Sequence, residues 1–304
     1  MHGQPHHTTA IVTASFGPDF ERCRLLCESM DAMATGQWQH YILVADHDAV
    51  LFRQLSGPRR TIVCDSALLP DWLKPVRRPF DKDGRWIWIS RNLKRQVWPM
   101  SGWHVQQLRK MLIARHISEN CLVMTDSDSV FMRPFGNDVF VHDGSLRLYA
   151  KAAGITAKAG FEKHVQWVVK AQRILGLPPK SIPATDYISN LVSWQRGHAL
   201  AMLERIEAQN GRELAAAMGR FRTFSEYQIY GALSEQILNG LGHVVDQRSL
   251  TLTYWTGEAL TEASLEDFIN TLSDRQIAIG IQSFIGVSTE MLRQSYRART
   301  ARLR

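Results

Sequence analysis

The chain has 304 residues, of which 45% are hydrophobic and 21% charged, with a formal net charge of +7 and a pI of about 9.4. This length suits one large α/β domain or two modest ones, and the composition is ordinary for a soluble globular protein. The positive charge favours acidic partners, namely nucleotide diphosphates, polyanionic glycans, nucleic acid or anionic lipid.

Neither an export signal nor a membrane-spanning segment is expected. The opening MHGQPHHTTA lacks the basic start and apolar stretch of a secretory signal. The longest apolar run, IAIGIQSFIGV at 277–287, is much shorter than the roughly 20 residues that a span needs. The 4 cysteines form no CxxC pair, so we predict reduced, mostly buried thiols in a cytoplasmic protein.

Strands and helices alternate along the first half of the chain. Runs rich in β-branched residues predict strands at 9–16, 40–48, 61–66 and 121–128. Asp19 suits the start of a helix that reaches about Thr35, a short helix follows from Ala49, and apolar residues at helical spacing predict a helix over 103–117. This alternation predicts an α/β fold with an open, mostly parallel sheet flanked by helices.

The second half of the chain is less regular. We expect helices at 161–175, 197–209, 211–218 and 224–238, and a final helix from about 288. We expect short strands at 147–150, 188–194, 243–246 and 277–281. Because the chain shows no internal repeat, low-complexity tract or linker, the pattern predicts one compact domain.

Two carboxylates follow the fourth predicted strand, in the stretch CLVMTDSDSVFMRPF at 121–135. Isolated charges there are costly to desolvate, so Asp126 and Asp128 need a partner such as a hard divalent cation or a hydroxyl-rich ligand. Polar residues also end the first and second strands, at 13–15 and 46–48. Ligands of parallel α/β sheets bind outside the carboxyl ends of the strands, so these residues predict a ligand crevice.

A D-x-D pattern has several meanings. An EF-hand loop starting at Asp126 needs Gly at its sixth position and Glu at its twelfth, where this chain has Phe131 and Asn137, so that class is excluded. A haloacid-dehalogenase-type phosphatase uses hhhhDxDx[TV], which 126–130 matches with Asp126 as nucleophile. Such enzymes carry the motif on their first strand, and no GDxxxD follows here. Solvated acids at a strand end, or a non-catalytic nucleotide- or saccharide-binding module, are further alternatives.

Three other segments bear on this choice: IVTASFGPDFERCRLLCESM at 11–30, GWHVQQLRKMLIA at 102–114 and TFSEYQIYGAL at 223–233. With VMTDSDSVFMRPF they resemble the DXD-containing glycosyltransferases of the GT-A fold, above all a poorly characterised bacterial glycosyltransferase-like family with a SEYxxYG segment. The resemblance covers most of 8–285. It implies a GT-A-like, Rossmann-type domain with a nucleotide-binding half at 8–135 and an acceptor half at 136–285, followed by a basic helix or tail at 286–304.

The resemblance also implies a divalent cofactor, Mn²⁺ or Mg²⁺. These ions take oxygen ligands from one or two carboxylates plus phosphates, and they neutralise the charge that builds on a leaving nucleoside diphosphate. By resemblance, Asp128 holds the metal, and Asp126 contacts the ribose or a metal-bound water. The family often adds a C-terminal histidine, for which this chain offers His243, although His243 also suits the start of a strand.

The implied reaction moves a sugar from a nucleotide-sugar donor to a hydroxyl of a bacterial saccharide or glycoconjugate. By resemblance, Asp46 contacts the nucleobase or ribose. The other residues placed around the base and ribose are Thr13, Ser15, Asp19 and Arg22.

Two acids are candidates for the base that deprotonates the acceptor hydroxyl. Glu226 begins a predicted helix, where it could instead be an acid favoured by the helix dipole. Asp186, in the turn PATDYIS, is the competing base. On the helix at 103–117, Gln107 could bond sugar hydroxyls and Lys110 could reach a phosphate, with a solvated helix face as the alternative.

Tryptophans and basic residues are concentrated in 71–103. This window holds five of the 9 tryptophans, and eight Lys or Arg against three Asp. Flat rings suit sugar faces, arginines suit phosphate or acidic sugars, and a strand would place Trp86 and Trp88 on one face. Interleaved aromatic and basic residues also suit single-stranded nucleic acid, but no RNA-binding motif is present, so we expect no nucleic-acid partner. A tryptophan-rich core loop with a solvated basic rim is the alternative.

The end of the chain, RQSYRARTARLR at 293–304, has five arginines and no acid. As a helix it is a basic stripe that would touch anionic lipid weakly, and a solvated tail is the alternative. Peripheral contact with an anionic inner membrane is therefore a hypothesis.

Overall fold

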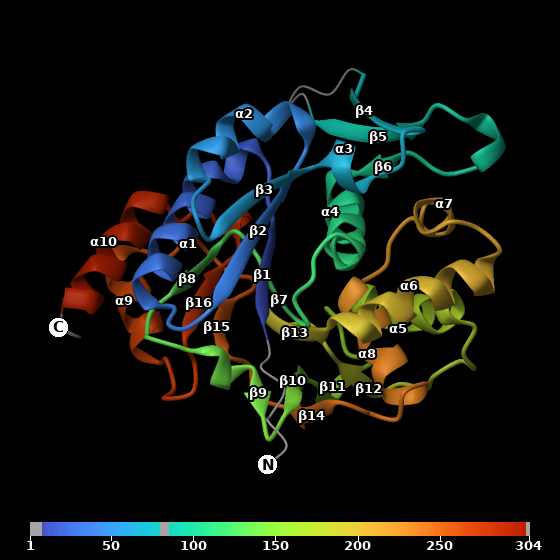
Figure 1. The fold of residues 1–304 in the computed structure, drawn as a ribbon. Helices are drawn as coiled ribbons and strands as arrows, with labels where there is room; N and C mark the ends of the chain where they lie inside the picture. Colours follow the sequence, from blue (N-terminus) through green and yellow to red (C-terminus); the bar gives the residue numbers. More distant parts are fainter. Residues whose placement is uncertain (1–7, 80–84, 302–304) are drawn as a thin grey trace, which may run out of the picture.

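A five-stranded mixed sheet runs through the centre of the molecule, in a computed structural model that describes residues 8–79 and 85–301 (Figure 1). Its strand order is β13-β7-β1-β2-β3, in which β13 alone runs antiparallel to its neighbour. The strands are β1 (Thr9–Ala14), β2 (Trp38–Val44), β3 (Arg60–Cys64), β7 (Cys121–Thr125) and β13 (Leu191–Gln195). The predicted α/β class with a mostly parallel sheet is confirmed.

The side chains of the central strands alternate between two helical layers. All six residues of β1 are buried. Ala10 and Val12 pack with the helices of one layer, and Ile11 packs with those of the other. Because successive side chains of a strand point to opposite faces, a strand buried on both faces reads as a near-continuous apolar run.

One face of the sheet is covered by three helices, α1 (Phe20–Met33), α9 (Glu262–Asn270) and α10 (Thr289–Ala301) (Figure 1). α10 buries Leu292 and Tyr296, and its Arg293 pairs with Glu28 of α1 at 3.3 Å. The basic segment predicted at 286–304 is therefore a helix docked on α1. Its last three residues lie outside the described residues.

The opposite face is covered by α4 (Gly102–Leu112), α5 (Glu162–Leu175), α6 (Arg196–Asn210), α7 (Leu214–Met218) and α8 (Glu226–Gln236). Val105, Leu108 and Met111 recur at helical spacing on α4 and are fully buried in the same core as Val12 and Met124. Both layers pack on the same sheet, so the described residues form one compact domain.

Four smaller sheets surround this core. One is β4 (Leu73–Arg77), β5 (Trp86–Ser90) and β6 (Met100–Ser101). A second is β8 (Ser129–Phe131), β15 (Thr251–Tyr254) and β16 (Ala278–Ile281). A third is β9 (Val141–His142), β10 (Ser145–Tyr149) and β14 (His243–Asp246). The last is the pair β11 (Lys151–Ile155) and β12 (Ala184–Asp186).

Short helices fill several connections. Two are α-helical, α2 (Ala49–Phe52) and α3 (Asp65–Leu68). The others are 3-10 turns, η1 (Gly17–Asp19), η2 (Asp46–Asp48), η3 (Arg53–Leu55), η4 (Leu93–Arg95), η5 (Ile113–Arg115), η6 (Asn137–Val139) and η7 (Ser283–Ile285).

Several predicted elements end earlier than expected, among them the strands predicted to residues 16, 66 and 128, which end at Ala14, Cys64 and Thr125. The strand predicted to Asp48 ends at Val44, because residues 46–48 turn into η2 and the Asp46 carboxylate accepts hydrogen bonds from Ser66 instead of extending the strand. The helix predicted over 103–117 ends at Leu112 and tightens into η5. The helices α3 and α9 and the small strands β4, β6, β8, β9, β11, β12 and β15 were not predicted. Within the described part of the chain, no helix is both long and apolar enough to cross a membrane.

Candidate functional site

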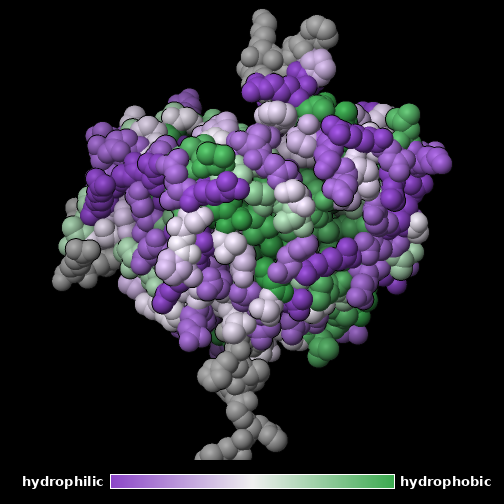
Figure 2. Space-filling view, turned by 45° about the horizontal axis from the view of Figure 1, so that its top comes forward, coloured by the Kyte–Doolittle hydropathy of each residue, from purple (hydrophilic) through white to green (hydrophobic). Residues whose placement is uncertain are grey.

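The loops that follow β1 and β7 meet at the carboxyl end of the parallel strands. In Figure 1, β1 rises from the N-terminal trace, so these ends point toward the top of the view. The Ser127 hydroxyl donates to Asp19 Oδ2 at 3.5 Å, which joins the two loops. Figure 2 turns this end toward the reader and shows hydrophobic side chains at the centre of the face, with hydrophilic ones around them.

Asp128 is a buried carboxylate with an unused oxygen. Its residue is 8% exposed, and no described residue donates a hydrogen bond to Oδ1. Burial raises the pKa of Asp128 to about 8, with further increases from the charges of Asp126 and Asp19 and a decrease from Arg22. A cation would satisfy the unused oxygen and reverse this pKa shift.

Arg22 fixes the opposite wall of the site. Its guanidinium donates to Ile281 O at 2.9 Å and to Val287 O at 2.6 Å. The Ile281 N–H in turn donates to Asp128 O at 3.3 Å. The first helix therefore holds the loop after β16 against the carboxylate pair.

Lys110 joins the carboxylate pair to α8. Its Nζ donates to Asp126 Oδ1 at 2.8 Å and to the Tyr227 hydroxyl at 3.0 Å, and it lies 3.4 Å from Glu226 Oε1. Burial alone would lower the pKa of Lys110, but the neighbouring Asp126, Tyr227 and Glu226 raise it well above its ordinary value. Lys110 is therefore a charged ammonium in a buried site, while the Asp126 side chain keeps 25% of its surface exposed.

Glu226 is held at the first turn of α8. The Ser225 side chain caps this helix by accepting from the Gln228 N–H at 3.4 Å, and the Glu226 N–H donates to Gln107 Oε1 at 3.1 Å. Burial raises the pKa of Glu226, and the charge of Lys110 opposes that rise. A carboxylate poised in this way can accept a proton from a bound hydroxyl.

The family is settled by a comparison with protein-family models. The model described as a family of unknown function (DUF6492) matches residues 8–294, which is most of the chain. The chain belongs to the DUF6492 family. A search among curated proteins gives no match.

Seven of the predicted site residues lie together in this DUF6492 protein. They are Asp19, Arg22, Gln107, Lys110, Asp126, Asp128 and Glu226, which are linked by the contacts described above. Helix spacing accounts for part of this, because Gln107 and Lys110 are three residues apart on α4 and share one face.

Two predicted residues are buried on the α1 side of the sheet. Thr13 is fully buried, and its hydroxyl lies 3.0 Å from Nε2 of His40, which leaves no surface for a nucleotide. Ser15 is also buried, just after β1. The period of two along β1 accounts for this, since Thr13 shares a face with the α1-facing Ile11.

Asp46 lies at the predicted sheet edge, but its carboxylate accepts hydrogen bonds from Ser66. Its Oδ1 accepts from the N–H and the hydroxyl of Ser66, at 3.1 and 2.8 Å. Among the described residues, no hydrogen bond or ion pair joins Asp46 to the carboxylate pair. The structure therefore places it beside α3 rather than within the site.

His243 is not placed with the carboxylates. Its Nε2 lies 2.7 Å from the Tyr230 hydroxyl and its Nδ1 lies 3.2 Å from Leu146 O, so both ring nitrogens have protein partners. Burial lowers its pKa to about 4. Across the described residues, no group of three or more His, Cys, Asp or Glu could hold a metal ion. The prediction of His243 as a third ligand has no geometric support.

Asp186 lies on the small sheet of β11 and β12, and among the described residues no hydrogen bond or ion pair joins it to Glu226 or to the carboxylate pair. Its Oδ1 accepts from the Ile188 N–H at 3.0 Å. Burial raises its pKa, while that hydrogen bond and the charges of His164 and Lys151 lower it. Glu226 is thus the base candidate that the geometry joins to the carboxylate pair.

The sequence prediction missed Tyr227 and the loop after β16. Tyr227 directly follows Glu226 and holds Lys110 from the far side. Its signal was present in the SEY segment, but a tyrosine in an apolar helix more often indicates core. The sequence does not indicate that the carbonyls of Ile281 and Val287 accept from Arg22, because every residue has a backbone carbonyl.

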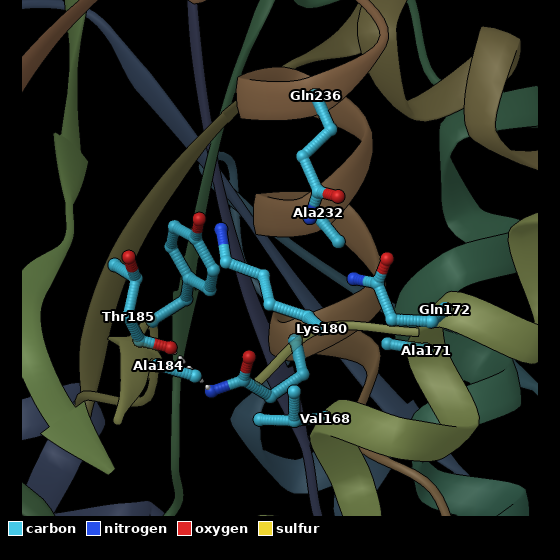
Figure 3. Close-up of a pocket in the computed structure, with 10 residues that line it drawn as sticks. Val168, Ala171, Gln172, Lys180, Ala184, Thr185, Ala232 and Gln236 are labelled. Atoms are coloured by element: carbon cyan, nitrogen blue, oxygen red, sulfur yellow. Dashed lines mark hydrogen bonds between the residues drawn. The ribbon is translucent and has the colours of Figure 1, made fainter. Parts of the chain in front are cut away.

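Two hollows lie away from the site. A cavity of about 10 Å³, roughly the space of one water, lies between α5, α8 and β12 (Figure 3). Val168, Gln172 and Thr185 line it, and Gln228 Nε2 donates to Thr185 O at 3.4 Å across one side. A wider groove of about 280 Å³ lies at the other end of the sheet, by Trp38. Neither contains the carboxylate pair.

Proposed function

We propose that this DUF6492 protein is a metal-dependent glycosyltransferase with a GT-A-like arrangement. It moves a sugar from a nucleotide-sugar donor to a hydroxyl of a bacterial saccharide or glycoconjugate. One observation carries the proposal. Asp126 and Asp128 directly follow a parallel strand, Asp128 has a buried carboxylate oxygen without a described donor, and Lys110 connects Asp126 to Glu226. Open α/β sheets bind nucleotides at this end.

The residues present fit a divalent cation. Asp128 Oδ1 has no described donor, Asp126 is partly exposed, and Mg²⁺ and Mn²⁺ ordinarily take one or two protein carboxylates plus substrate phosphates. Asp126 and Asp128 would hold the ion, with Asp19 near them. The ion would supply the positive charge that stabilises the departing diphosphate.

Lys110 has a positioning role in this proposal. Its ammonium remains charged and donates to Asp126 Oδ1, which sets the direction of the second carboxylate oxygen. Tyr227 holds the ammonium from the other side. A lysine bound by two acids and a hydroxyl cannot swing away without leaving buried charges unpaired.

Glu226 is the proposed base for an inverting reaction. The acceptor hydroxyl gives its proton to the Glu226 carboxylate as its oxygen bonds to the anomeric carbon, and the bond from that carbon to the donor phosphate oxygen breaks. Its raised pKa makes Glu226 a stronger base than an exposed glutamate. In a retaining reaction, Glu226 would only position the acceptor.

The test is a thermal-shift screen of UDP, GDP, CDP and ADP, each with and without Mn²⁺. A ligand that binds only the folded state at 100 times its Kd adds about 2.7 kcal/mol of stability, which raises the Tm of a chain of this size by about 4 °C. We expect one nucleotide to do so only with Mn²⁺, and not in Asp128→Ala. The control is Asp71→Ala, which removes a fully exposed aspartate. No shift from any nucleotide would overturn the proposal.

The arrangement of Asp126 and Asp128 also favours a second function, that of a phosphohydrolase. Asp126 has a free carboxylate oxygen for attack on phosphorus, and Asp128 has a pKa of about 8 and could protonate the leaving oxygen. In that reaction the bond from phosphorus to the ester oxygen breaks as Asp126 becomes phosphorylated. Phosphate release from p-nitrophenyl phosphate, abolished in Asp126→Asn, would support this second function. No release would exclude it.

A further inference from the structure

A stacked tryptophan pair lies next to the base candidate. The ring centroids of Trp103 and Trp167 are 5.7 Å apart, and their planes differ by 22°. Trp103 lies one turn before Gln107 on α4, and the Gln107 side chain donates to Trp103 O at 3.4 Å. The same side chain accepts from the Glu226 N–H. One glutamine therefore links the aromatic pair to Glu226.

Hydrogen bonds and ring contacts hold this pair against the segment that precedes α8. Trp167 Nε1 donates to the Thr223 hydroxyl at 2.7 Å, and Phe224 is buried with its ring centroid 6.4 Å from that of Trp103. His104 packs against Phe224 and bonds through Nδ1 to the Ser101 hydroxyl at 2.8 Å. The segment that leads into Glu226 is thus fixed to the aromatic pair from below.

Trp103 is partly exposed even though aromatic rings surround it. The residue is 42% exposed, whereas Phe224 beside it is 1% exposed. An exposed flat apolar ring next to buried polar groups is typical of ligand sites, where the ring supplies area and the polar groups fix orientation. Such a ring suits the apolar face of a sugar, whose C–H bonds meet the negative face of the ring.

Two cations lie near the pair, one on α5 and one just before α8. The basic residues of 85–118 contribute less, because four of the seven pair with acids elsewhere in the fold. Lys170 lies three residues after Trp167 on α5; burial lowers the pKa of His104, and the charge of Lys170 lowers it further. Arg222 is exposed and lies over the ring of Trp98, 4.6 Å from its centroid. A ligand on Trp103 therefore meets cations at its edge.

We propose that Trp103 and Trp167 form a subsite for an anionic saccharide acceptor. One sugar ring stacks on the exposed part of Trp103, its acidic group faces Lys170 and Arg222, and the next hydroxyl lies toward Glu226. This rests on the proposed function and names its acceptor class, a saccharide that carries a carboxylate or phosphate. No bond changes in this step, which is binding alone.

The test is calorimetric titration of trigalacturonic acid and of its methyl ester, which lacks the charges. The variants are Trp103→Ala, Trp103→Phe and, as a control, Val169→Ala, which shortens an exposed apolar residue on α5. We expect wild type and Val169→Ala to bind the acid equally, Trp103→Ala to bind it about tenfold more weakly, and Trp103→Phe to stay within about threefold. Tenfold corresponds to about 1.4 kcal/mol, the scale of one aromatic contact. We expect the methyl ester to bind at least fivefold more weakly than the acid.

A thermal-shift measurement with the nucleotide and Mn²⁺ on the same variants separates the two proposals. Trp103→Ala should keep the wild-type nucleotide shift, because Trp103 belongs to the acceptor side. If the nucleotide binds but the acid binds wild type and Trp103→Ala equally, or binds neither, the subsite is overturned and the transferase stands. Equal binding of the acid and the ester also overturns it. Trp103-dependent binding of the acid without any nucleotide shift supports the saccharide site and overturns the transferase.

Discussion

Asp65 and Asp128 are both buried aspartates that follow parallel strands of one sheet, and their surroundings are opposite. Asp65 accepts from Arg109 at 2.6 and 2.9 Å and from Trp88 Nε1 at 3.0 Å. Asp128 has an oxygen with no described donor, and the nearby Arg22 uses its guanidinium on two backbone carbonyls.

This difference separates a stabilising carboxylate from one held ready for a ligand. A buried charge is tolerable when paired and hydrogen-bonded, as at Asp65, and costly when it is not, as at Asp128. Both aspartates depend on consecutive residues of α4. Arg109 pairs with Asp65, and Lys110 pairs with Asp126, the neighbour of Asp128. One helix therefore supports the fold with one side chain and the site with the next.

The largest effect is expected from breaking the satisfied pair. Arg109→Met leaves Asp65 buried without its cation, so the free energy of unfolding should fall by about 4 kcal/mol, as for other broken buried pairs. Urea denaturation followed by circular dichroism measures it. The control is Arg115→Met, because the Arg115–Glu207 pair is partly exposed and should contribute less than about 1 kcal/mol. Equal losses in both variants would contradict the distinction.

The next effect concerns the unsatisfied carboxylate and its dependence on pH. The pKa of Asp128 is about 8 in the folded state and near 3.8 when unfolded, so the folded state holds a proton that unfolding releases between these values. Wild type should therefore lose stability as pH rises from 5 to 8, by about 3 kcal/mol relative to Asp128→Asn, which cannot ionise.

Denaturation in EDTA at pH 5, 6.5 and 8 checks this dependence. Added Mn²⁺ should shrink the difference at pH 8, because a cation stabilises the ionised carboxylate. Parallel pH profiles for wild type and Asp128→Asn would show that Asp128 titrates normally and is not held for a ligand.

The smallest effect isolates one hydrogen bond to Asp65. Trp88→Phe removes the Nε1 donor, and Trp194→Phe makes the same change at a buried tryptophan whose Nε1 has no described partner. Both lose similar packing, so the Trp88 variant should be less stable by a further 2 kcal/mol or so, because a hydrogen bond to a charged group contributes about 1.5–3 kcal/mol. No difference between the two would mean that Arg109 alone satisfies Asp65.

The sequence predicted the carboxylate pair and Lys110 from local rules, and Glu226 from the resemblance of the SEY segment to the glycosyltransferase-like family. A strand run that ends in D-x-D predicts a ligand edge, and helix spacing places Gln107 and Lys110 on one face. The same rules wrongly assigned Thr13 to the ligand crevice. Side chains at the end of a strand alternate between two faces, and the face that contains Thr13 is buried. His243 was proposed because the resembling family often adds a C-terminal histidine. Its Nε2 instead lies beside the hydroxyl of Tyr230, a residue of α8.

The partners that the sequence could not predict are distant in the chain. Arg22 and Ile281 are 259 residues apart, and the bond is to a backbone carbonyl that has no residue signature. Lys110 and Tyr227 are 117 apart. No periodicity or motif reports contacts of this kind, because they depend on how β16 and α8 pack after the sheet has formed.

The clamp of Arg22 on residues 281 and 287 has a consequence for the order in which the molecule is made. A ribosome releases β1, α1 and β7 long before the loop after β16, and until that loop arrives Arg22 has no carbonyls to hold and Asp128 has no wall. We expect a nascent chain that ends within α9 to form the sheet but leave the carboxylates hydrated, with an ordinary acid titration. The site is therefore completed late in synthesis, once residues 281–287 have emerged, and only α10 follows it.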